Sequence, residues 1–261
     1  MQVEFGAIGN RCCRNGCGGS RRNTTTMADS DSASVCILSG TETQGDSSVA
    51  RILAAVCMLA ALVLVGSRLA AYDTLGAWSK MIASTSFIGV AFSVGAHRWG
   101  YGRVLLAGLF FAWWGDFFLI GSSDTRFLLG LVSFLLGHVM YCVAFVVRGI
   151  DVRWSMLTIP MVVAVTGGAS WWLGPHVSDE MTGPVRAYTG VISVMVVLAV
   201  GARGAGAPWV VPVGAILFYF SDISVAAGQF VKPDFPNYVW GLPFYFGGQV
   251  LLAWSGRDDT Q

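Results

Sequence analysis

Residues 127–147 read FLLGLVSFLLGHVMYCVAFVV, an apolar run bounded by Arg126 and Arg148. The run contains no Asp, Glu, Lys or Arg, and its length is close to the roughly 20 residues that an α-helix needs to cross a bilayer. Similar runs recur along the chain, so the sequence predicts an all-α membrane protein with eight transmembrane helices. The predicted spans are residues 49–66, 79–96, 103–121, 127–147, 155–173, 185–201, 207–228 and 238–255.

Composition supports the same fold class. Of the 261 residues, 54% are hydrophobic and 12% are charged, whereas roughly a quarter of the residues of a soluble domain are charged. The net charge is +1, and the basic residues stand singly between the apolar runs. This pattern lacks the concentrated basic surface that phosphate backbones require, so we expect no nucleic acid partner.

The chain divides into three predicted regions. Residues 1–47 are rich in Ser, Thr, Gly and Asn, and such a composition buries too little apolar surface to offset its ordering entropy. We therefore expect a disordered leader over residues 1–47, an eight-helix transmembrane domain over 48–256 and a short tail over 257–261. Met27 is an alternative translation start within the leader.

The connectors between the spans predict the topology. Basic residues are more numerous in the connectors on the side of the two termini than in the opposite ones. By the positive-inside rule, both termini are predicted to be cytosolic. If the source is eukaryotic, the endoplasmic reticulum or another endomembrane is the expected location.

An internal repeat relates the two halves of the chain. Gly108 precedes Asp116 in the third span at the same spacing at which Gly214 precedes Asp222 in the seventh. Four spans separate the equivalent elements, so both halves have one orientation and form a parallel repeat of four helices plus four. The fourth and eighth spans also match: Phe127, Gly130, Phe134, Gly137 and His138 align with Tyr238, Gly241, Tyr245, Gly248 and Gln249.

Asp116 and Asp222 lie well inside their spans. A carboxylate in hydrocarbon is costly unless it is solvated or paired, so an intramembrane aspartate is a candidate functional residue that faces a cavity. The alternative is a structural role, in which each carboxylate is hydrogen-bonded to a neighbouring helix. The equivalent positions of the two residues in the repeat favour the functional interpretation.

Other polar residues of the spans have two open interpretations. His138 is either a ligand-binding residue or a hydrogen-bonded packing residue, and its repeat equivalent is Gln249. Tyr141 and Tyr245 are either interfacial aromatic residues or hydrogen-bond donors to a ligand. Lys80 either extends to the lipid headgroups or contacts a phosphate at the mouth of a cavity.

The order and spacing of these residues resemble the YhhN family of integral membrane lysoplasmalogenases. The resemblance extends from Lys80 to Trp254 and implies hydrolysis of the vinyl ether bond of a lysoplasmalogen. The products would be a fatty aldehyde and glycerophosphoethanolamine or glycerophosphocholine. The motifs that carry it are Gly115-Asp116, then Phe134, Gly137, His138 and Tyr141, then Ser221-Asp222, and finally Tyr245 and Gln249.

The expected chemistry needs an acid and an anion together. A vinyl ether hydrolyses after protonation of its β-carbon, which leaves an oxocarbenium ion that water attacks. Two nearby carboxyl groups in a low-dielectric site do not both ionise easily, so one can donate the proton while the other stabilises the cation. Asp116 and Asp222 are therefore the predicted catalytic pair, with the roles of the two left open.

The remaining site residues are assigned to substrate binding. Lys80, His138, Tyr141, Tyr245 and Gln249 are predicted to position the water and the headgroup of a lysophospholipid that enters from the membrane lipids. The expected site uses no cofactor and no metal, because the clustered His and Cys ligands of a zinc site are missing from the sequence pattern.

Two other functions remain open at this point. A proton-coupled transporter of a small or lipid-like substrate also uses internal repeats and paired intramembrane carboxylates. The spans, however, carry few of the glycine and proline interruptions expected of broken transport helices, since prolines such as Pro184 and Pro208 lie near span ends. A noncatalytic lipid-binding or scaffold protein would tolerate replacement of both aspartates.

Overall fold

A computed structural model describes residues 30–121, 123–232 and 236–257, with side chains from Ser48 onward. Contacts divide the chain into two units, Met1–Gly40 and Thr41–Gln261, and the fold described below is that of the second. Within the predicted leader, residues 1–29 lie outside the described part, whereas residues 30–47 are helical. Residues 258–261 of the predicted tail also lie outside it.

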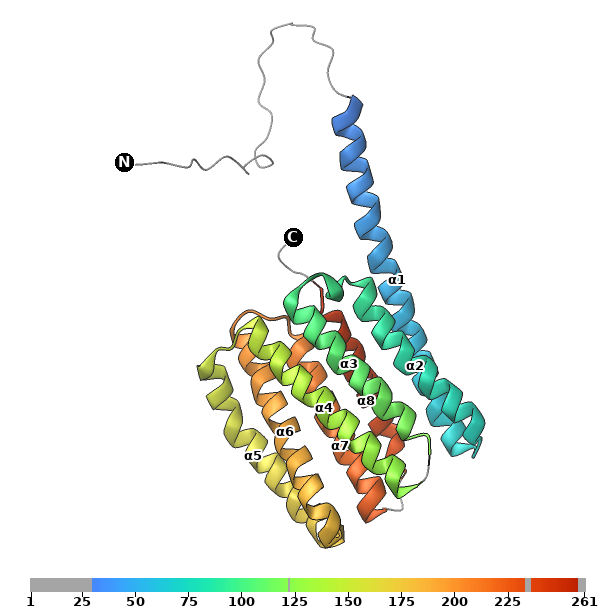
Figure 1. Ribbon diagram of the computed structural model, residues 1–261, viewed down its shortest axis with the longest axis vertical. Helices are drawn as coiled ribbons and strands as arrows, with labels where there is room; N and C mark the ends of the chain where they lie inside the picture. The colour runs from blue at the N-terminus through green and yellow to red at the C-terminus, as the bar shows by residue number, and fades with distance from the viewer. Residues whose placement is uncertain (1–29, 122, 233–235, 258–261) are drawn as a thin grey trace, which may run out of the picture. The chain divides into compact units, whose positions relative to one another are not determined.

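The described chain is all-helical, as the sequence predicts, and one long helix corresponds to each predicted span (Figure 1). A single 3-10 turn follows α2 and another follows α5, at Ala96–Arg98 and Gly174–His176, and a π-helical turn, η3, covers Ala227–Val231. The long helices are α1 (Ser30–Leu69), α2 (Asp73–Ser93), α3 (Gly100–Phe118), α4 (Asp124–Arg148), α5 (Val152–Leu173), α6 (Asp179–Gly204), α7 (Val210–Ala226) and α8 (Tyr238–Trp254).

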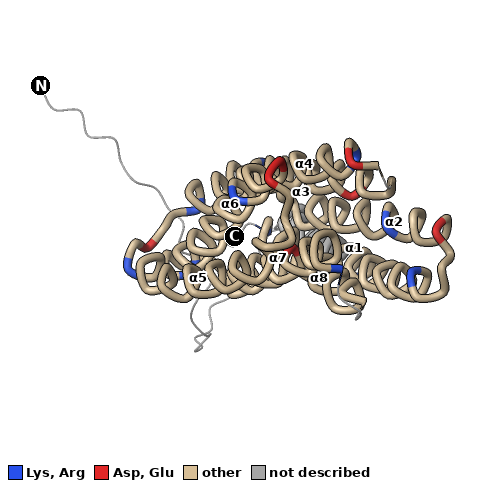
Figure 2. Tube along the Cα trace, turned by 90° about the horizontal axis from the view of Figure 1, so that it is seen from below, with Lys and Arg blue, Asp and Glu red and all other residues tan. Residues whose placement is uncertain are grey.

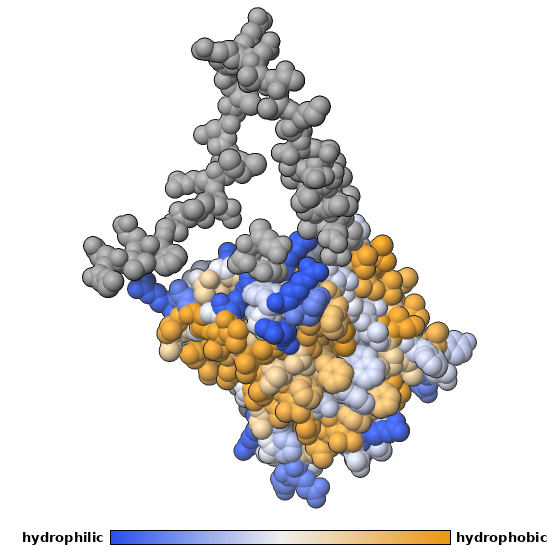
Figure 3. All heavy atoms as spheres, turned by 45° about the horizontal axis from the view of Figure 1, so that its top comes forward, coloured by the Kyte–Doolittle hydropathy of each residue, from blue (hydrophilic) through white to orange (hydrophobic). Residues whose placement is uncertain are grey.

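Five of the described helices are long and apolar enough to cross a membrane: Ser48–Leu69 of α1, α4, α5 with the turn that follows it, α6, and α7 with η3. Their outer surfaces are apolar, and Leu157 and Trp171 of α5 are 80% and 83% exposed. Hydrophobic side chains cover much of the flank seen in Figure 3. Charged residues lie mostly toward the helix ends, as the largely uncharged tube of Figure 2 shows. Such a surface is suited to hydrocarbon, so the protein is a membrane protein.

Local sequence signals set the ends of helices. The Asp151 carboxylate accepts hydrogen bonds from the backbone N–H groups of Arg153 and Trp154 at 2.8 and 3.3 Å, which begins α5. Gly149, with φ of 107°, ends α4 in a conformation that other residues rarely adopt. The direct connection from α4 to α5 therefore depends on a glycine and an aspartate.

Two pairs of glycines bring neighbouring helices into close contact. A Cβ atom added at Gly108 of α3 would lie 3.2 Å from the carbonyl oxygen of Gly137 of α4. Between α7 and α8, a Cβ atom at Gly248 would lie 2.8 Å from the carbonyl oxygen of Gly214. Small residues at membrane helix interfaces allow this approach. The glycine pattern of the sequence therefore sets how closely α3 packs on α4 and α7 packs on α8.

The two halves also exchange contacts. Helix α2 packs against α3 of its own half and against α8 of the other. Helix α6 likewise packs against α7 of its own half and against α4 of the other. As a result, α3 and α7, which carry Asp116 and Asp222, each lie within reach of side chains from both halves of the chain.

Replacing Gly248 by Ala is expected to lower the thermal unfolding temperature of the protein in detergent. The new methyl group meets a backbone oxygen that cannot move alone, so α7 and α8 must separate, at a cost of about 1–3 kcal/mol. Gly167→Ala is the matched control, because this glycine of α5 has nothing within 4 Å of an added Cβ atom. An unfolding temperature for Gly248→Ala equal to or above that of Gly167→Ala would contradict the close contact.

Candidate active site

A cavity of about 610 Å³ lies among helices α2 to α8. Asp116 and Asp222 both line it, together with Lys80, Tyr188 and Tyr245. Apolar side chains form much of the remaining wall, among them Leu119, Leu131, Phe134, Leu173, Ile192 and Ile223. The cavity thus combines two carboxyl groups with an apolar surface.

The cavity extends to the end of the domain formed by residues 174–178, 227–232 and 236–237. Thr182, Arg186 and Lys232 line it there, and the side chains of Arg186 and Lys232 are exposed. Lys232 follows the π-helical turn η3 with φ of 47°. Turns of this kind occur frequently at functional sites. The mouth of the cavity is therefore basic, whereas its interior holds the carboxyl groups.

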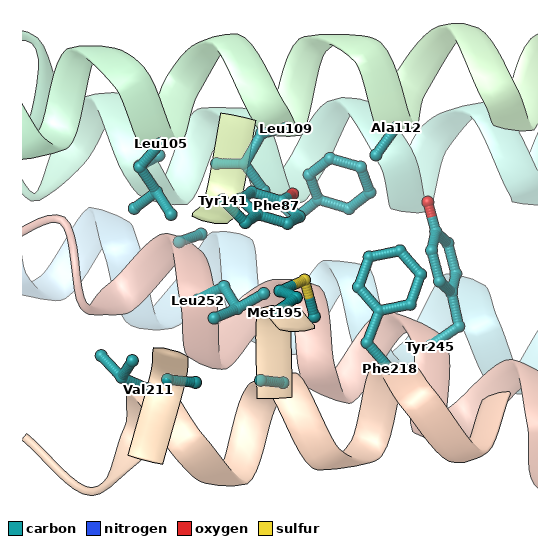
Figure 4. Packing of buried hydrophobic residues seen from close by; sticks show 14 of the residues in the cluster. Phe87, Leu105, Leu109, Ala112, Tyr141, Met195, Val211, Phe218, Tyr245 and Leu252 are labelled. Carbon is teal, nitrogen blue, oxygen red and sulfur yellow. The ribbon is translucent and has the colours of Figure 1, made fainter. Parts of the chain in front are cut away.

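Three donors surround the carboxyl group of Asp116, which is 1% exposed. The Lys80 ammonium lies 3.3 Å from Oδ1, and the hydroxyls of Ser84 and Tyr245 each lie 2.6 Å from Oδ2. Lys80 and Ser84 are one helical turn apart on α2, and Tyr245 comes from α8. Figure 4 shows the Tyr245 hydroxyl pointing from α8 toward α3. The Asp116 carboxyl group is therefore held by side chains from two other helices.

Different partners surround the carboxyl group of Asp222, whose side chain is 14% exposed. The hydroxyl of Tyr188, on α6, donates to Oδ2 at 2.6 Å. Nε2 of His138, on α4, lies 3.4 Å from the same oxygen. The other ring nitrogen, Nδ1 of His138, is 2.6 Å from the carbonyl oxygen of Phe134. Asp222 thus has a histidine and a tyrosine as neighbours, whereas Asp116 has a lysine, a serine and a tyrosine.

An aromatic cluster separates the surroundings of the two aspartates. The Phe218 ring lies 4.6 Å from the His138 ring and 5.1 Å from the Tyr245 ring, measured between centroids. Phe134 contacts both Phe218 and Tyr245 edge to face. Among the described residues no hydrogen bond joins Asp116 to Asp222. The two carboxyl groups therefore share the cavity without forming a directly bonded pair.

The structure divides the predicted site residues into two groups. Asp116, Asp222, Lys80 and Tyr245 line the cavity. His138, Tyr141 and Gln249 do not belong to its lining; the Tyr141 hydroxyl instead donates to Oε1 of Gln249 at 2.7 Å, in a place where both side chains are buried. These three residues can reach a ligand only through the side chains that they contact.

Lys80 lies in the cavity wall and not at the lipid headgroups, which was one of the two placements left open for it. Its side chain is 9% exposed and pairs with Asp116, so it does not extend to the lipid headgroups. The reason is electrostatic, because a buried carboxylate attracts the nearest cation more strongly in a low-dielectric interior than water or headgroups do at the surface.

Sequence analysis missed two hydroxyl donors, Ser84 and Tyr188. Ser84 lies four residues after Lys80, so helical periodicity places both on one face, and this spacing was an available signal. Tyr188 lies in a span whose sequence has no recognised motif, and its role depends on the packing of α6 against α7. Spacing alone gives no such signal for Tyr188.

Replacing Lys80 by Met is expected to lower the stability of the folded protein by about 3–5 kcal/mol, because Asp116 keeps a buried charge without its cation. Thermal unfolding in detergent measures the change. Arg68→Met is the control, since Arg68 lies 3.9 Å from Asp73 in an exposed pair worth less than about 1 kcal/mol. Equal unfolding temperatures for the two variants would show that the buried pair does not stabilise the fold.

Known proteins match this chain over most of its helical domain. It is 29% identical to "Lysoplasmalogenase TMEM86A" of Bos taurus over 163 residues, which cover 60% of this chain and 66% of the bovine protein. The human protein of the same name is 30% identical over the same shares. A "Lysoplasmalogenase" of Mycobacterium tuberculosis is 32% identical over 147 residues, or 54% of each chain.

The matched segment spans just under two thirds of the length of the bovine and human relatives. No solved structure matches the chain significantly. The sequence profile of one family, however, matches residues 47–256, which include every helix that lines the cavity. The chain belongs to the YhhN family.

Proposed function

We propose that the protein is a lysoplasmalogenase, which hydrolyses the vinyl ether bond of lysoplasmenylethanolamine or lysoplasmenylcholine. The observation that carries the proposal is the pair of carboxyl groups, Asp116 and Asp222, in one cavity of a membrane protein. The names of the similar bovine, human and mycobacterial proteins support the same activity. The products are a fatty aldehyde and glycerophosphoethanolamine or glycerophosphocholine.

The cavity has the chemistry that this reaction requires. Protonation of the β-carbon converts the vinyl ether to an oxocarbenium ion, water adds to the carbon bound to oxygen, and the resulting hemiacetal breaks down. One carboxyl group supplies the proton and a second, ionised one stabilises the cation, as in glycosidases. Both groups act in a water-poor site, where electrostatic stabilisation is stronger than in bulk water.

The lining is suited to a lipid with one chain. Apolar residues such as Leu131, Phe134 and Ile192 offer a surface for the alkenyl chain. The exposed cations Arg186 and Lys232 lie at the mouth, where the phosphate of the headgroup would remain close to the membrane surface. A lysophospholipid from the surrounding membrane lipids and a water molecule are therefore the proposed partners.

The other predicted substrate-binding residues act at different distances from the ligand in this proposal. Lys80 and Tyr245 touch the cavity and hold Asp116. His138 acts through Asp222, and the Tyr141–Gln249 hydrogen bond supports the packing of α4 against α8 behind the cavity wall.

We also infer that the domain consists of two parallel four-helix repeats and crosses the membrane eight times. Each aspartate receives a hydroxyl from the second helix of its own half, Ser84 or Tyr188, and a group from the fourth helix of the other half, Tyr245 or His138. The equivalent glycine contacts of α3–α4 and α7–α8 support the same symmetry.

The proposed topology places both termini in the cytosol. The supporting observation is that arginines gather in the connectors on the side of the termini. There, Arg148 stacks on Trp99 and Tyr101, and Arg203 stacks on Trp209. The cavity would then open toward the opposite leaflet, which faces the lumen if the membrane is an endomembrane.

Purified protein in detergent is expected to release fatty aldehyde from lysoplasmenylethanolamine and not from an ester-linked lysolipid. Asp116→Asn and Asp222→Asn are each expected to lose about 10²-fold or more of this activity, because each removes a charge or a proton that the transition state needs. The exposed Asp73 is outside the cavity, so Asp73→Asn is the control and should keep full activity. Near-normal turnover by both cavity variants, or none by the folded wild type, would contradict the proposal.

A further inference from the structure

We propose that the two aspartates have different fixed roles: Asp222, paired with His138, holds and delivers the proton, whereas Asp116 remains a carboxylate that stabilises the cation. The division of roles rests on the proposed hydrolysis of a vinyl ether. The two carboxyl groups have different partners in the folded protein, and these partners favour different protonation states.

Asp116 has the surroundings of an ionised carboxylate. The ammonium of Lys80 supplies a compensating charge at 3.3 Å, and the Ser84 and Tyr245 hydroxyls are each 2.6 Å from Oδ2. Hydrogen bonds from several donors favour the charged form of a carboxyl group. The Ser84 hydroxyl has a single hydrogen and also lies 2.9 Å from the carbonyl oxygen of Lys80, so the Lys80 ammonium and the Tyr245 hydroxyl are the donors that favour the charged form of Asp116.

The tautomer of His138 follows from its backbone contact. Nδ1 lies 2.6 Å from the carbonyl oxygen of Phe134, and a carbonyl oxygen only accepts hydrogen bonds, so Nδ1 carries a hydrogen. In the neutral ring Nε2 then has a lone pair; it lies 3.4 Å from Oδ2 of Asp222 and has no hydrogen-bond partner among the described residues. A lone pair this close to a carboxylate oxygen is repelled by its negative charge. A proton on the Asp222 carboxyl group removes that charge and weakens the repulsion.

Asp222 is also the aspartate that can release a proton to a ligand. Its side chain is 14% exposed, against 2% for Asp116, and it lines the cavity. Both of its partners, Tyr188 and His138, are at Oδ2. Oδ1 has no hydrogen bond to the described residues. This oxygen is therefore available for a proton directed into the cavity, while His138 remains buried behind it.

The proposed steps balance as follows. The π electrons of the vinyl ether form a new C–H bond at the β-carbon with the proton of Asp222 Oδ1, and the ether oxygen shares the resulting positive charge, opposite the Asp116 carboxylate. Water then forms a C–O bond at the α-carbon and gives one proton back to Asp222. Breakdown of the hemiacetal moves the remaining hydroxyl proton to the glycerol oxygen, so the net reaction consumes one water.

Histidine labelling tests the contact between His138 and Asp222 without any substrate. The chain contains three histidines, so ¹⁵N nuclear magnetic resonance of the full-length protein in bilayers can resolve His138, assigned by its loss in His138→Gln. We expect Nδ1 to be protonated, and the Nε2 resonance to change in Asp222→Asn but to stay as in the wild type in Asp116→Asn. An Nε2 resonance that is unaffected by Asp222→Asn, or that responds to Asp116→Asn alone, would overturn the pairing.

Chemical rescue tests the site of the anion. Formate is an anion at neutral pH, so it can occupy the space left by the Asp116 side chain beside Lys80 and replace the missing carboxylate. We expect formate to raise the turnover of Asp116→Ala by about tenfold or more, out of the roughly 10²–10³-fold that one electrostatic contact to a transition state contributes. Asp222→Ala should show no rescue, because an anion does not supply the proton that Asp222 delivers.

The two measurements also separate this inference from the proposed function. Rescue of Asp222→Ala in place of Asp116→Ala, or the same response of both variants to formate, would overturn the assigned roles while leaving the hydrolase activity intact. If the wild type released no aldehyde, the proposed function would fail. The resonance of His138 would still decide whether Nε2 is affected by the Asp222 carboxyl group.

Discussion

The burial of the Asp116 carboxyl group inside the helical domain is the constraint on which much of the arrangement depends. A carboxylate removed from water costs several kcal/mol unless a cation and hydrogen-bond donors replace the lost hydration. Helix α3 cannot provide these groups itself, so Lys80 and Ser84 of α2 and Tyr245 of α8 must lie beside it. Electrostatic interactions, as well as packing, therefore stabilise the contact between the first and second halves of the chain.

The same constraint acts at Asp222, but different side chains meet it. Tyr188 and His138 replace the serine, the lysine and the tyrosine that surround Asp116. A lysine carries its charge permanently at neutral pH, whereas a histidine can gain or lose a proton. The two aspartates therefore offer different chemistry, because their partners differ.

The rest of the domain keeps these polar groups away from lipid. Glycine contacts hold α3 on α4 and α7 on α8 closely enough for side chains from both pairs to meet across the cavity. The outer surface is apolar, and the polar opening lies at the end of the domain where Arg186 and Lys232 are exposed. This arrangement allows an amphipathic molecule to place its polar part at the mouth and its apolar part against the wall.

The sequence by itself determined the helices and the membrane environment, and it singled out Asp116 and Asp222 as candidate functional residues. Hydrophobic run length and the cost of a charge in hydrocarbon are local properties, so no tertiary contact is needed to recognise them. Only the tertiary structure decided which groups meet. Lys80 pairs with Asp116, and Tyr188 donates a hydrogen bond to Asp222 although no sequence motif marks it. Tyr141 and Gln249 are hydrogen-bonded to each other behind the cavity wall. These contacts depend on the packing of helices distant in the sequence, and helical periodicity fixes the face of a residue but not the neighbour that the face meets.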